Sequence, residues 1–253
     1  MVRLGQNFLA DRNLLDAIVR DAQLDPTDVV LEVGGGTGVL STAVAPSVSD
    51  LHVIELDQRL ADDLEAVVAE HGNVHAHVAD AMRLDLTTID PAPTKMVANL
   101  PYSIATPVLL RTIAELPSLR SWTVMVQREI ADRLRAEPGS RTYGGPSVLV
   151  QLACEVRLLR PVDRAVFTPR PRVDSALLGL TRTASAAPQP VVELVHDAFA
   201  HRRKSLARSL EHARPGTREP AREALEALGL PADARAEQLS PLQFVALAER
   251  LAP

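Results

Sequence analysis

The sequence predicts an α/β domain with a parallel sheet, followed by a small all-helical domain. Three observations predict this. Short apolar segments alternate with helical patterns over the first 180 residues, a segment of small residues and prolines interrupts them, and only helical patterns follow. Alternating strands and helices form crossover units, which build parallel sheets. With the linker placed at "TRTASAAPQP" (181–190), we expect domains at residues 1–182 and 183–253.

The expected elements follow from the spacing of apolar residues. Helical spacing of three and four residues predicts helices at 11–22 and 58–71. Beyond the linker, 191–213 is expected to form one helix and 219–230 another. The last helix is expected to begin after Ser240, with Pro241 in the first turn and Gln243 completing a capping box. Strands are expected at 29–34, 51–56, 74–79, 95–100, 122–127, 153–159 and 175–180.

Composition narrows the class of protein. No apolar segment approaches the roughly 20 residues of a membrane-spanning helix, and the N-terminus lacks the apolar core of a signal peptide. The single cysteine, Cys154, excludes an internal disulfide and a multi-cysteine zinc site. We therefore expect a cytoplasmic protein without a bound metal.

Charge is distributed unevenly along the chain. The net charge is −5, and residues 1–100 hold 6 Lys+Arg against 16 Asp+Glu. Residues 120–182 hold 11 basic against 6 acidic side chains. This distribution argues against general polyanion binding and indicates a basic region inside an acidic protein.

A glycine-rich loop follows the first expected strand. "LEVGGGTGVL" places Gly34, Gly36 and Gly38 where the backbone must turn tightly and approach a ligand. The dinucleotide fingerprint needs a glycine three residues after Gly36, where this chain has Val39, and no Lys-Ser/Thr pair of a triphosphate-binding loop follows. The loop therefore suits a cofactor with an amino-acid tail, such as S-adenosylmethionine, although a plain tight turn is the alternative.

Polar side chains also follow the next strands. Glu55 ends the second strand, where an acidic residue accepts ribose hydroxyls. Asp80 follows the third strand and is placed to accept from an adenine amino group. Asn99 and Leu100 end the fourth strand, which Pro101 stops, and Tyr102 comes directly after it. Each alone is compatible with an ordinary loop, but their succession at strand ends indicates a ligand site.

With these motifs the sequence resembles the rRNA adenine N6-dimethyltransferase family of the KsgA type. The resemblance runs from "GQNFLAD" (5–11) through "EVGGGTG", "NLPYSIATP" and "FTPRPRVDSALL" to "AFAHRRKSLARSL" (198–210). It implies a Rossmann-like S-adenosylmethionine-dependent methyltransferase sheet with a small C-terminal all-helical domain. It also implies cofactor contacts at Asn7, Leu9, Gly34, Gly36, Glu55, Asp80 and Asn99.

The chain departs from the family pattern at a few positions. Gly35 replaces a usual proline, Ser103 and Ala105 replace Asn and Ser, and Pro146 stands where Leu is common. The basic tail that often precedes "GQNFL" is nearly absent. These departures spare the reacting groups and leave the choice of substrate open.

The motif around Asn99 suits methylation of an amino group. The exocyclic nitrogen of adenine is a poor nucleophile because its lone pair is delocalised into the ring. The Asn99 side-chain oxygen and the Leu100 carbonyl, aimed by Pro101, can accept its N–H groups and so turn the lone pair toward the methyl group. Tyr102 offers a face for stacking the flipped-out base, and the resemblance implies Phe167 for the other face, with a core role as its alternative.

Basic residues are expected to hold the RNA. The resemblance implies small-subunit rRNA within a ribosomal particle as the partner of a monomeric enzyme, with the target in two adjacent adenines of the 3′-terminal hairpin. Solvated helix charges are the alternative explanation for these side chains. The expected RNA-binding residues are Arg128, Arg133, Arg135, Arg170, Arg172, Arg202, Arg203, Lys204 and Arg208.

Three other functions stay open at this point. An Erm-type methylase of large-subunit rRNA shares the fold, but usually has isoleucine at the position of Leu100. A ribosome-assembly factor without catalysis would not need Asn99 and Tyr102. A DNA adenine methylase fits the basic "HRRKSL" segment less well.

Overall fold

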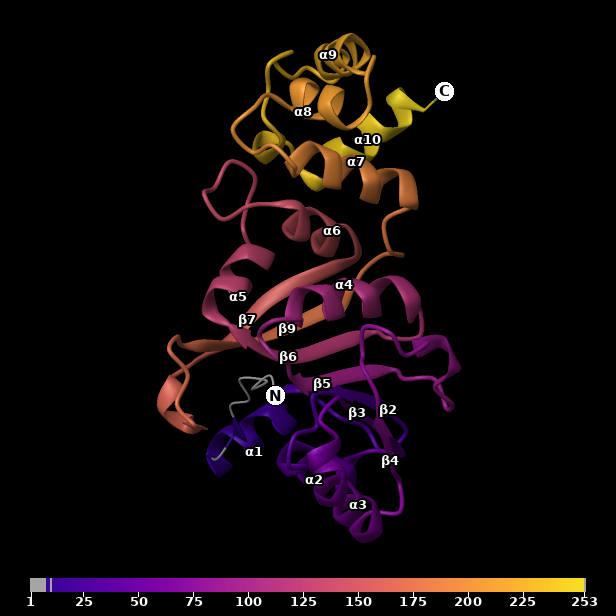
Figure 1. Ribbon diagram of the computed structural model, residues 1–253, viewed down its shortest axis with the longest axis vertical. Helices are drawn as coiled ribbons and strands as arrows, with labels where there is room; N and C mark the ends of the chain where they lie inside the picture. Colours follow the sequence, from indigo (N-terminus) through magenta and orange to yellow (C-terminus); the bar gives the residue numbers. More distant parts are fainter. Residues whose placement is uncertain (1–7, 10, 253) are drawn as a thin grey trace. The chain divides into compact units, whose positions relative to one another are not determined.

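The computed structural model describes residues 8–9 and 11–252 and divides into two compact units (Figure 1). The first comprises the chain through Ala131 together with Val156–Arg182, and the second comprises Asp132–Glu155 together with the chain from Thr183. Residues 132–155 thus group with the helical unit, although the expected boundary lies at residues 182–183. The two units are described separately below.

The described residues of the first unit form a seven-stranded sheet in the order β4-β3-β2-β5-β6-β9-β7. Neighbouring strands from β4 to β6 pair in parallel, and β9 runs antiparallel to β6. All seven expected strands are present, with no end shifted by more than three residues. Their bounds are β2 Val29–Val33, β3 Asp50–Glu55, β4 Val74–Val78, β5 Lys95–Asn99, β6 Ser121–Gln127, β7 Cys154–Val162 and β9 Ser175–Arg182.

Helices connect the parallel strands. α1 begins after Asp11, whose side chain accepts a hydrogen bond from the Leu14 N–H at 2.8 Å, which satisfies one of the free donors of the first turn. A parallel strand that is covered on both faces of the sheet has a mostly apolar sequence. The segment "VVLEV" of β2, which is buried along its whole length, has this character. The helices of this unit are α1 Arg12–Asp21, α2 Val39–Val44, α3 Ala61–Glu70 and α4 Ala105–Glu115, and α5 Arg128–Leu134 crosses the division between the units.

One arginine closes the C-terminal end of α4. Arg182, the last residue of β9, donates to the carbonyl oxygens of Ile113 at 3.0 Å, Leu116 at 3.1 Å and Leu119 at 2.6 Å. Its guanidinium also lies 5.1 Å from the ring centre of Trp122, which is fully buried. This arginine therefore satisfies carbonyls that a helix end leaves without a donor.

The second unit is built around its own apolar core. The hydroxyl of Tyr143 donates to the Leu239 carbonyl at 2.9 Å, and Tyr143, Val148 and Phe244 are fully buried in the same cluster. This shared core explains why residues 132–155 group with the helices that follow residue 183. The helices of this unit are α6 Gly145–Ala153, α7 Gln189–Phe199, α8 Leu206–Ala213, α9 Arg218–Ala227 and α10 Pro241–Leu251.

The expected single helix over 191–213 is wrong. The chain leaves the helix after Phe199 and begins α8 at Leu206, with a turn between them (the orange part of Figure 1). Ser209 donates to the Asp197 carbonyl at 2.7 Å, so α8 packs back against the end of α7. Helical periodicity continues through 191–213, and this tertiary contact overrides it. By contrast, the capping box of Ser240 and Gln243 is confirmed.

No helix within residues 8–9 and 11–252 is long and apolar enough to cross a membrane. The same residues contain no group of three or more His, Cys, Asp or Glu side chains suited to a metal ion.

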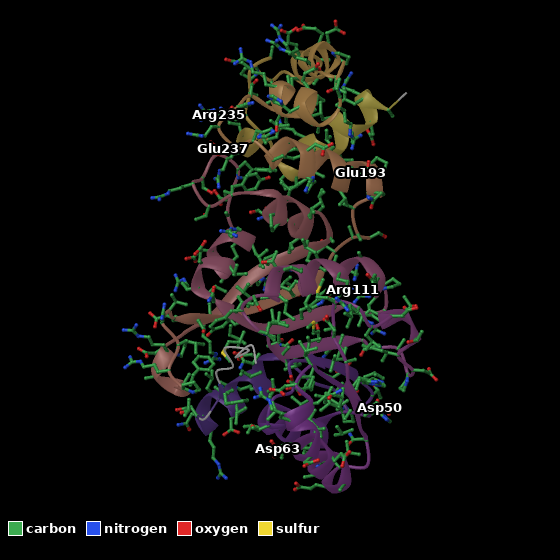
Figure 2. All side chains as sticks on the ribbon, in the orientation of Figure 1. Asp50, Asp63, Arg111, Glu193, Arg235 and Glu237 are labelled. Carbon is green, nitrogen blue, oxygen red and sulfur yellow. The ribbon has the colours of Figure 1, made fainter. Side chains whose placement is uncertain are left out.

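Three histidines lie together on β3 and β4. His52 is 2% exposed, and its Nε2 lies 3.1 Å from the Pro91 carbonyl while its Nδ1 lies 3.2 Å from His77 Nε2. Its ring stacks on His75 with 4.8 Å between centroids, and His75 Nε2 lies 3.0 Å from the carboxylate of Asp50, which is labelled in Figure 2. Burial first, and then the nearby charges of His75 and His77, lower the pKa of His52 to about 4.

This cluster predicts a specific sensitivity to acid. The unfolded chain protonates His52 near its ordinary value of 6.5, but the folded protein protonates it only near 4. Stability is therefore complete above about pH 6.5 and falls as the pH drops toward 4, by about 2 kcal/mol between pH 7 and pH 5. His52→Gln cannot take up a proton there, so its free energy of unfolding in urea should fall less over this interval.

The matched control is His196→Gln on the exposed side of α7, which should lose stability with pH as the unchanged protein does. Equal losses for His52→Gln and the unchanged protein would contradict the role of His52.

Candidate active site

A cavity of about 450 Å³ opens at the carboxyl ends of the parallel strands of the first unit. Residues from the loops after β2, β3, β4 and β5 line it, where open α/β sheets bind ligands. The structure therefore brings the sequence-predicted strand-end residues to one place. The expected site residues that line the cavity are Leu9, Gly34, Gly36, Glu55, Asp80, Asn99, Leu100, Pro101 and Tyr102. Asn7 lies outside the described residues.

The glycine loop touches the NLPY segment. Gly34 has φ +86°, and a Cβ there would lie 3.0 Å from Cδ of Pro101. A side chain at Gly35 would lie only 2.3 Å from a methyl group of Val53 on β3. Position 34 therefore needs glycine, both for its positive φ and for the lack of space beside Pro101. Position 35 needs a residue without a side chain because Val53 lies so close.

Glu55 fixes the shape of the loop. The side chain is 5% exposed, and both carboxylate oxygens accept backbone N–H groups, one from Gly36 and one from Asp57, each at 2.8 Å. A carboxylate has about four lone-pair positions, so these two bonds leave acceptor capacity. One buried side chain thus joins the glycine loop to the turn after β3 and can accept further hydroxyl donors in the cavity.

Asp80 and several apolar side chains form another part of the wall. Asp80 Oδ1 accepts from the Met82 N–H at 2.9 Å, and Oδ2 lies 3.6 Å from Arg83 Nε. Leu56 is 50% exposed and Met82 is 36% exposed, and both line the cavity. Large apolar side chains left open beside an acceptor are suited to the flat ring of a nucleobase. The sequence analysis missed both apolar residues, although Leu56 comes one residue after Glu55 and Met82 two residues after Asp80.

Glu32 is another residue of the cavity wall that sequence reasoning missed. It lies in the buried strand β2, is 1% exposed, and accepts a hydrogen bond from the Ser41 hydroxyl at 2.6 Å. The pKa of Glu32 is raised to about 8, mainly by burial and to a smaller extent by the charge of Glu55. The hydrogen bond from Ser41 acts in the opposite direction and lowers it. The signal in the sequence was an acid inside the apolar run "VVLEV", since buried acids are rare unless they are paired or functional.

The NLPY segment is held from both sides. Asn99 is the last residue of β5, and the Leu100 N–H donates to the Met125 carbonyl of β6 at 3.1 Å. The Tyr102 hydroxyl lies 2.8 Å from the hydroxyl of Ser175, the first residue of β9, and burial raises the pKa of Tyr102. The tyrosine ring is therefore fixed in the cavity wall by a residue that the sequence did not single out.

Phe167 does not line the cavity. It is 3% exposed, packs in the core cluster that contains Leu14 and Leu15, and pairs with Leu9 in the short antiparallel sheet of β1 Phe8–Leu9 and β8 Phe167–Thr168. The structure thus places it as the core residue that the sequence offered as the alternative. A stacking role for Phe167 stays a prediction.

The expected RNA-binding residues fall into both units. Arg128, Arg170 and Arg172 are exposed in the α/β unit, and Arg170 lies 3.7 Å from Asp163. Arg133 and Arg135 belong to the helical unit, where Arg135 is exposed and Arg133 half-buried. The RNA-binding role that the sequence predicts for these five arginines stays a prediction.

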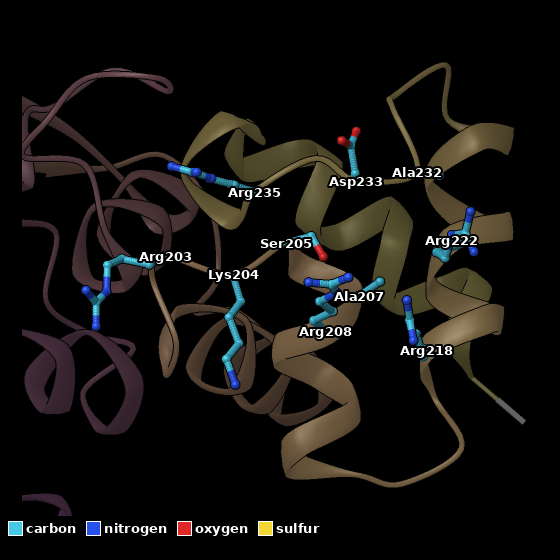
Figure 3. Close-up of a pocket in the computed structure, with 10 residues that line it drawn as sticks. All are labelled: Arg203, Lys204, Ser205, Ala207, Arg208, Arg218, Arg222, Ala232, Asp233 and Arg235. Carbon is cyan, nitrogen blue, oxygen red and sulfur yellow. The ribbon is translucent and has the colours of Figure 1, made fainter.

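The segment 202–208 does form a basic groove. Arg203, Lys204 and Arg208 line a cavity of about 630 Å³ together with three arginines from farther along the chain, Arg218, Arg222 and Arg235, and one acid, Asp233 (Figure 3). Arg202 is not part of the lining, because it forms an ion pair with Glu237 at 3.0 Å and donates to the Arg141 carbonyl. Arg202 to Lys204 lie in the turn before α8, and only Arg208 lies on the helix.

This sheet and its strand-end cavity define the class of protein, a Rossmann-like methyltransferase. A sequence profile of the family described as "Ribosomal RNA adenine dimethylase" matches residues 2–253. The chain belongs to this family, which confirms the fold class and the class of enzyme predicted from the motifs. Methyltransferases of this family use S-adenosylmethionine, so the predicted cofactor is confirmed as well.

Relatives and solved structures agree with this assignment. "Ribosomal RNA small subunit methyltransferase A" of Rubrobacter xylanophilus is 44% identical, covering 99% of this chain and 95% of the relative. Its namesake in Thermobifida fusca is 42% identical, covering 97% and 88%. A dimethyladenosine transferase of Plasmodium falciparum has a similar structure, with a TM-score of 0.80 at 25% identity and 95% coverage of each chain. The 23S rRNA methyltransferase ErmE gives a TM-score of 0.70 at 29% identity, covering 97% of this chain and 99% of ErmE.

Proposed function

We propose that this protein dimethylates the N6 amino groups of two adjacent adenosines in the 3′-terminal hairpin of small-subunit rRNA. It acts in ribosome biogenesis, as a cytoplasmic monomer, on rRNA within a ribosomal particle. The observation that carries the proposal is the cavity in which Glu55, Asp80 and the Asn99–Tyr102 segment converge. The names of the relatives that are 42–44% identical support the small subunit as the target.

The cavity fits S-adenosylmethionine, which supplies a methyl group on a positively charged sulfur. Glu55 accepts the two ribose hydroxyls with the lone pairs that Gly36 and Asp57 leave unused. Asp80 accepts from the adenine amino group, and Leu56 and Met82 cover the faces of the ring. Gly34 and Gly36 let the backbone approach the cofactor, while Leu9 lines the same cavity and Asn7 is implied by the resemblance.

Glu32 suits the charged amino group of the cofactor's tail. A buried carboxyl with a pKa near 8 is largely protonated at neutral pH. An ammonium group brought against it favours the ionised form and forms a charge-assisted hydrogen bond. The acid is thereby matched to a cationic ligand, and this explains why an acidic side chain is tolerated inside β2.

The Asn99–Tyr102 segment receives the target base. The Asn99 side-chain oxygen and the Leu100 carbonyl accept the N6 hydrogens, which turns the nitrogen lone pair toward the methyl group. Pro101, packed near Gly34, sets the direction of that carbonyl. Tyr102, fixed by Ser175, supplies the stacking face for a base taken out of its helix. Holding nitrogen and methyl group in line is a proximity effect, so small displacements of this segment lower the rate.

Basic side chains hold the RNA through its phosphates. The groove of Arg203, Lys204, Arg208 and their neighbours carries a dense positive charge on an otherwise acidic protein. Phosphate contacts give affinity without sequence choice, so selectivity comes from a folded RNA site that presents an exposed adenine. Arg128, Arg133, Arg135, Arg170 and Arg172 are proposed to contact RNA as well.

We predict that Asn99→Ala lowers the rate of methyl transfer by about a hundredfold or more, because one preorganised acceptor is lost. The measurement is methyl incorporation at saturating S-adenosylmethionine into unmethylated small-subunit particles, with dimethyladenosine identified by mass spectrometry. The melting temperature should change little, because Asn99 lies at the end of its strand.

A near-normal rate for Asn99→Ala would refute the acceptor mechanism. Free large-subunit rRNA is the comparison substrate, and a preference of the unchanged enzyme for it would favour the activity of ErmE over the proposed one.

We predict that charge reversal in the groove weakens RNA binding specifically. Arg203→Glu with Arg208→Glu should raise the KM for small-subunit particles several-fold and lower the salt dependence of binding, because phosphate contacts are lost. The control is Arg250→Glu, an exposed position at the end of α10 that does not line the groove. Equal KM values for the groove variant and the control would remove the groove from the RNA-binding surface.

A further inference from the structure

Arg111 joins two segments that adjoin the active site and are distant in the sequence. It lies on α4, which begins three residues after Tyr102, and its side chain is only 16% exposed (labelled in Figure 2). Nη1 donates to the Ala81 carbonyl at 2.5 Å, and Nη2 donates to the Leu84 carbonyl at 2.6 Å. Glu115, one turn along the helix, accepts from Nε at 2.8 Å and orients the guanidinium.

The loop that Arg111 reaches is the one that carries Asp80 and Met82. It leaves the sheet after β4, and its internal bonds converge on Asp80, whose carbonyl accepts from Arg83 and Leu84 at 2.9 and 2.8 Å. Ala81 is 6% exposed, so its carbonyl needs a donor from the protein. A guanidinium presents several N–H groups in a fixed plane and can satisfy two carbonyls at once.

We propose that Arg111 is a positioning residue for cofactor binding, which holds the 80–84 loop so that Asp80 and Met82 stay in the wall of the cavity. The inference rests on the proposed use of the cavity for S-adenosylmethionine. Arg111 has no contact with the reacting atoms, and its action passes through the loop. Because α4 starts three residues after the NLPY segment ends, the same side chain also fixes the adenine-binding loop to the helix that follows the target-base site.

This role predicts a particular pattern of binding and kinetics. Arg111→Met removes both donors and should raise the Kd for S-adenosylhomocysteine and the KM for S-adenosylmethionine about tenfold, with a much smaller change in kcat. Arg111→Lys keeps the positive charge and a single donor nitrogen, so it should restore part of the affinity. The Kd for 5′-methylthioadenosine should rise by the same factor, because it contains the adenine that the loop contacts.

Arg182→Met is the matched control. Arg182 also donates to backbone carbonyls of the α4 region, but at the far end of the helix and away from the cavity lining. Its loss should lower the melting temperature and leave the affinity for S-adenosylhomocysteine within twofold of the unchanged protein. A general loss of stability would instead weaken binding in both variants.

Calorimetry on the full chain separates the outcomes. If folded Arg111→Met binds S-adenosylhomocysteine as the unchanged protein does, or if Arg182→Met weakens binding equally, the positioning role is overturned. If the unchanged protein itself fails to bind S-adenosylhomocysteine, the proposed function fails, and with it the premise of this inference.

Discussion

The active site depends on one buried carboxylate. Glu55 accepts from Gly36 with one oxygen and from Asp57 with the other, so a single side chain sets both the glycine loop and the turn after β3. Burying a carboxylate is unfavourable unless hydrogen bonds to the charged form compensate, and two backbone donors do so here. The loop that Glu55 shapes then packs Gly34 against Pro101, which carries the constraint to the NLPY segment. In the proposed function, binding of the ribose and placement of the target base are thus linked through backbone geometry.

The other loops of the site are held by polar side chains from neighbouring elements. Ser175 of β9 fixes the hydroxyl of Tyr102, and Arg111 of α4 fixes the carbonyls of the loop after Asp80. These contacts come from rigid helices and strands, which hold a site more accurately than loops can alone. Such support matters for the proposed mechanism of methyl transfer, which uses no strong base and relies on alignment. The protein therefore contributes a set of fixed acceptors and surfaces.

Much of this arrangement was predictable from the sequence. Apolar segments of the sequence located the strands. Because the ends of successive parallel strands meet at one edge of the sheet, Glu55, Asp80 and Asn99 could be predicted to line one cavity. What depends on tertiary contacts was not predictable. The helix over 191–213 breaks because α8 packs against α7, and Arg202 pairs with Glu237, 35 residues away, instead of lining the groove. The sequence left open whether Phe167 stacks on a base or packs in the core, and its burial depends on tertiary packing. The role proposed for Arg111 likewise depends on carbonyls about 30 residues earlier in the chain.

The most direct test of the account is the affinity of Glu55→Gln for S-adenosylhomocysteine. An amide places an NH2 group against one of the two backbone donors, so the variant loses a bond and gains a repulsive contact. The account predicts that the Kd measured by calorimetry rises at least tenfold, while Glu65→Gln on the exposed side of α3 binds as the unchanged protein does. A Glu55→Gln protein that folds and binds S-adenosylhomocysteine with unchanged affinity would contradict the central role of this carboxylate.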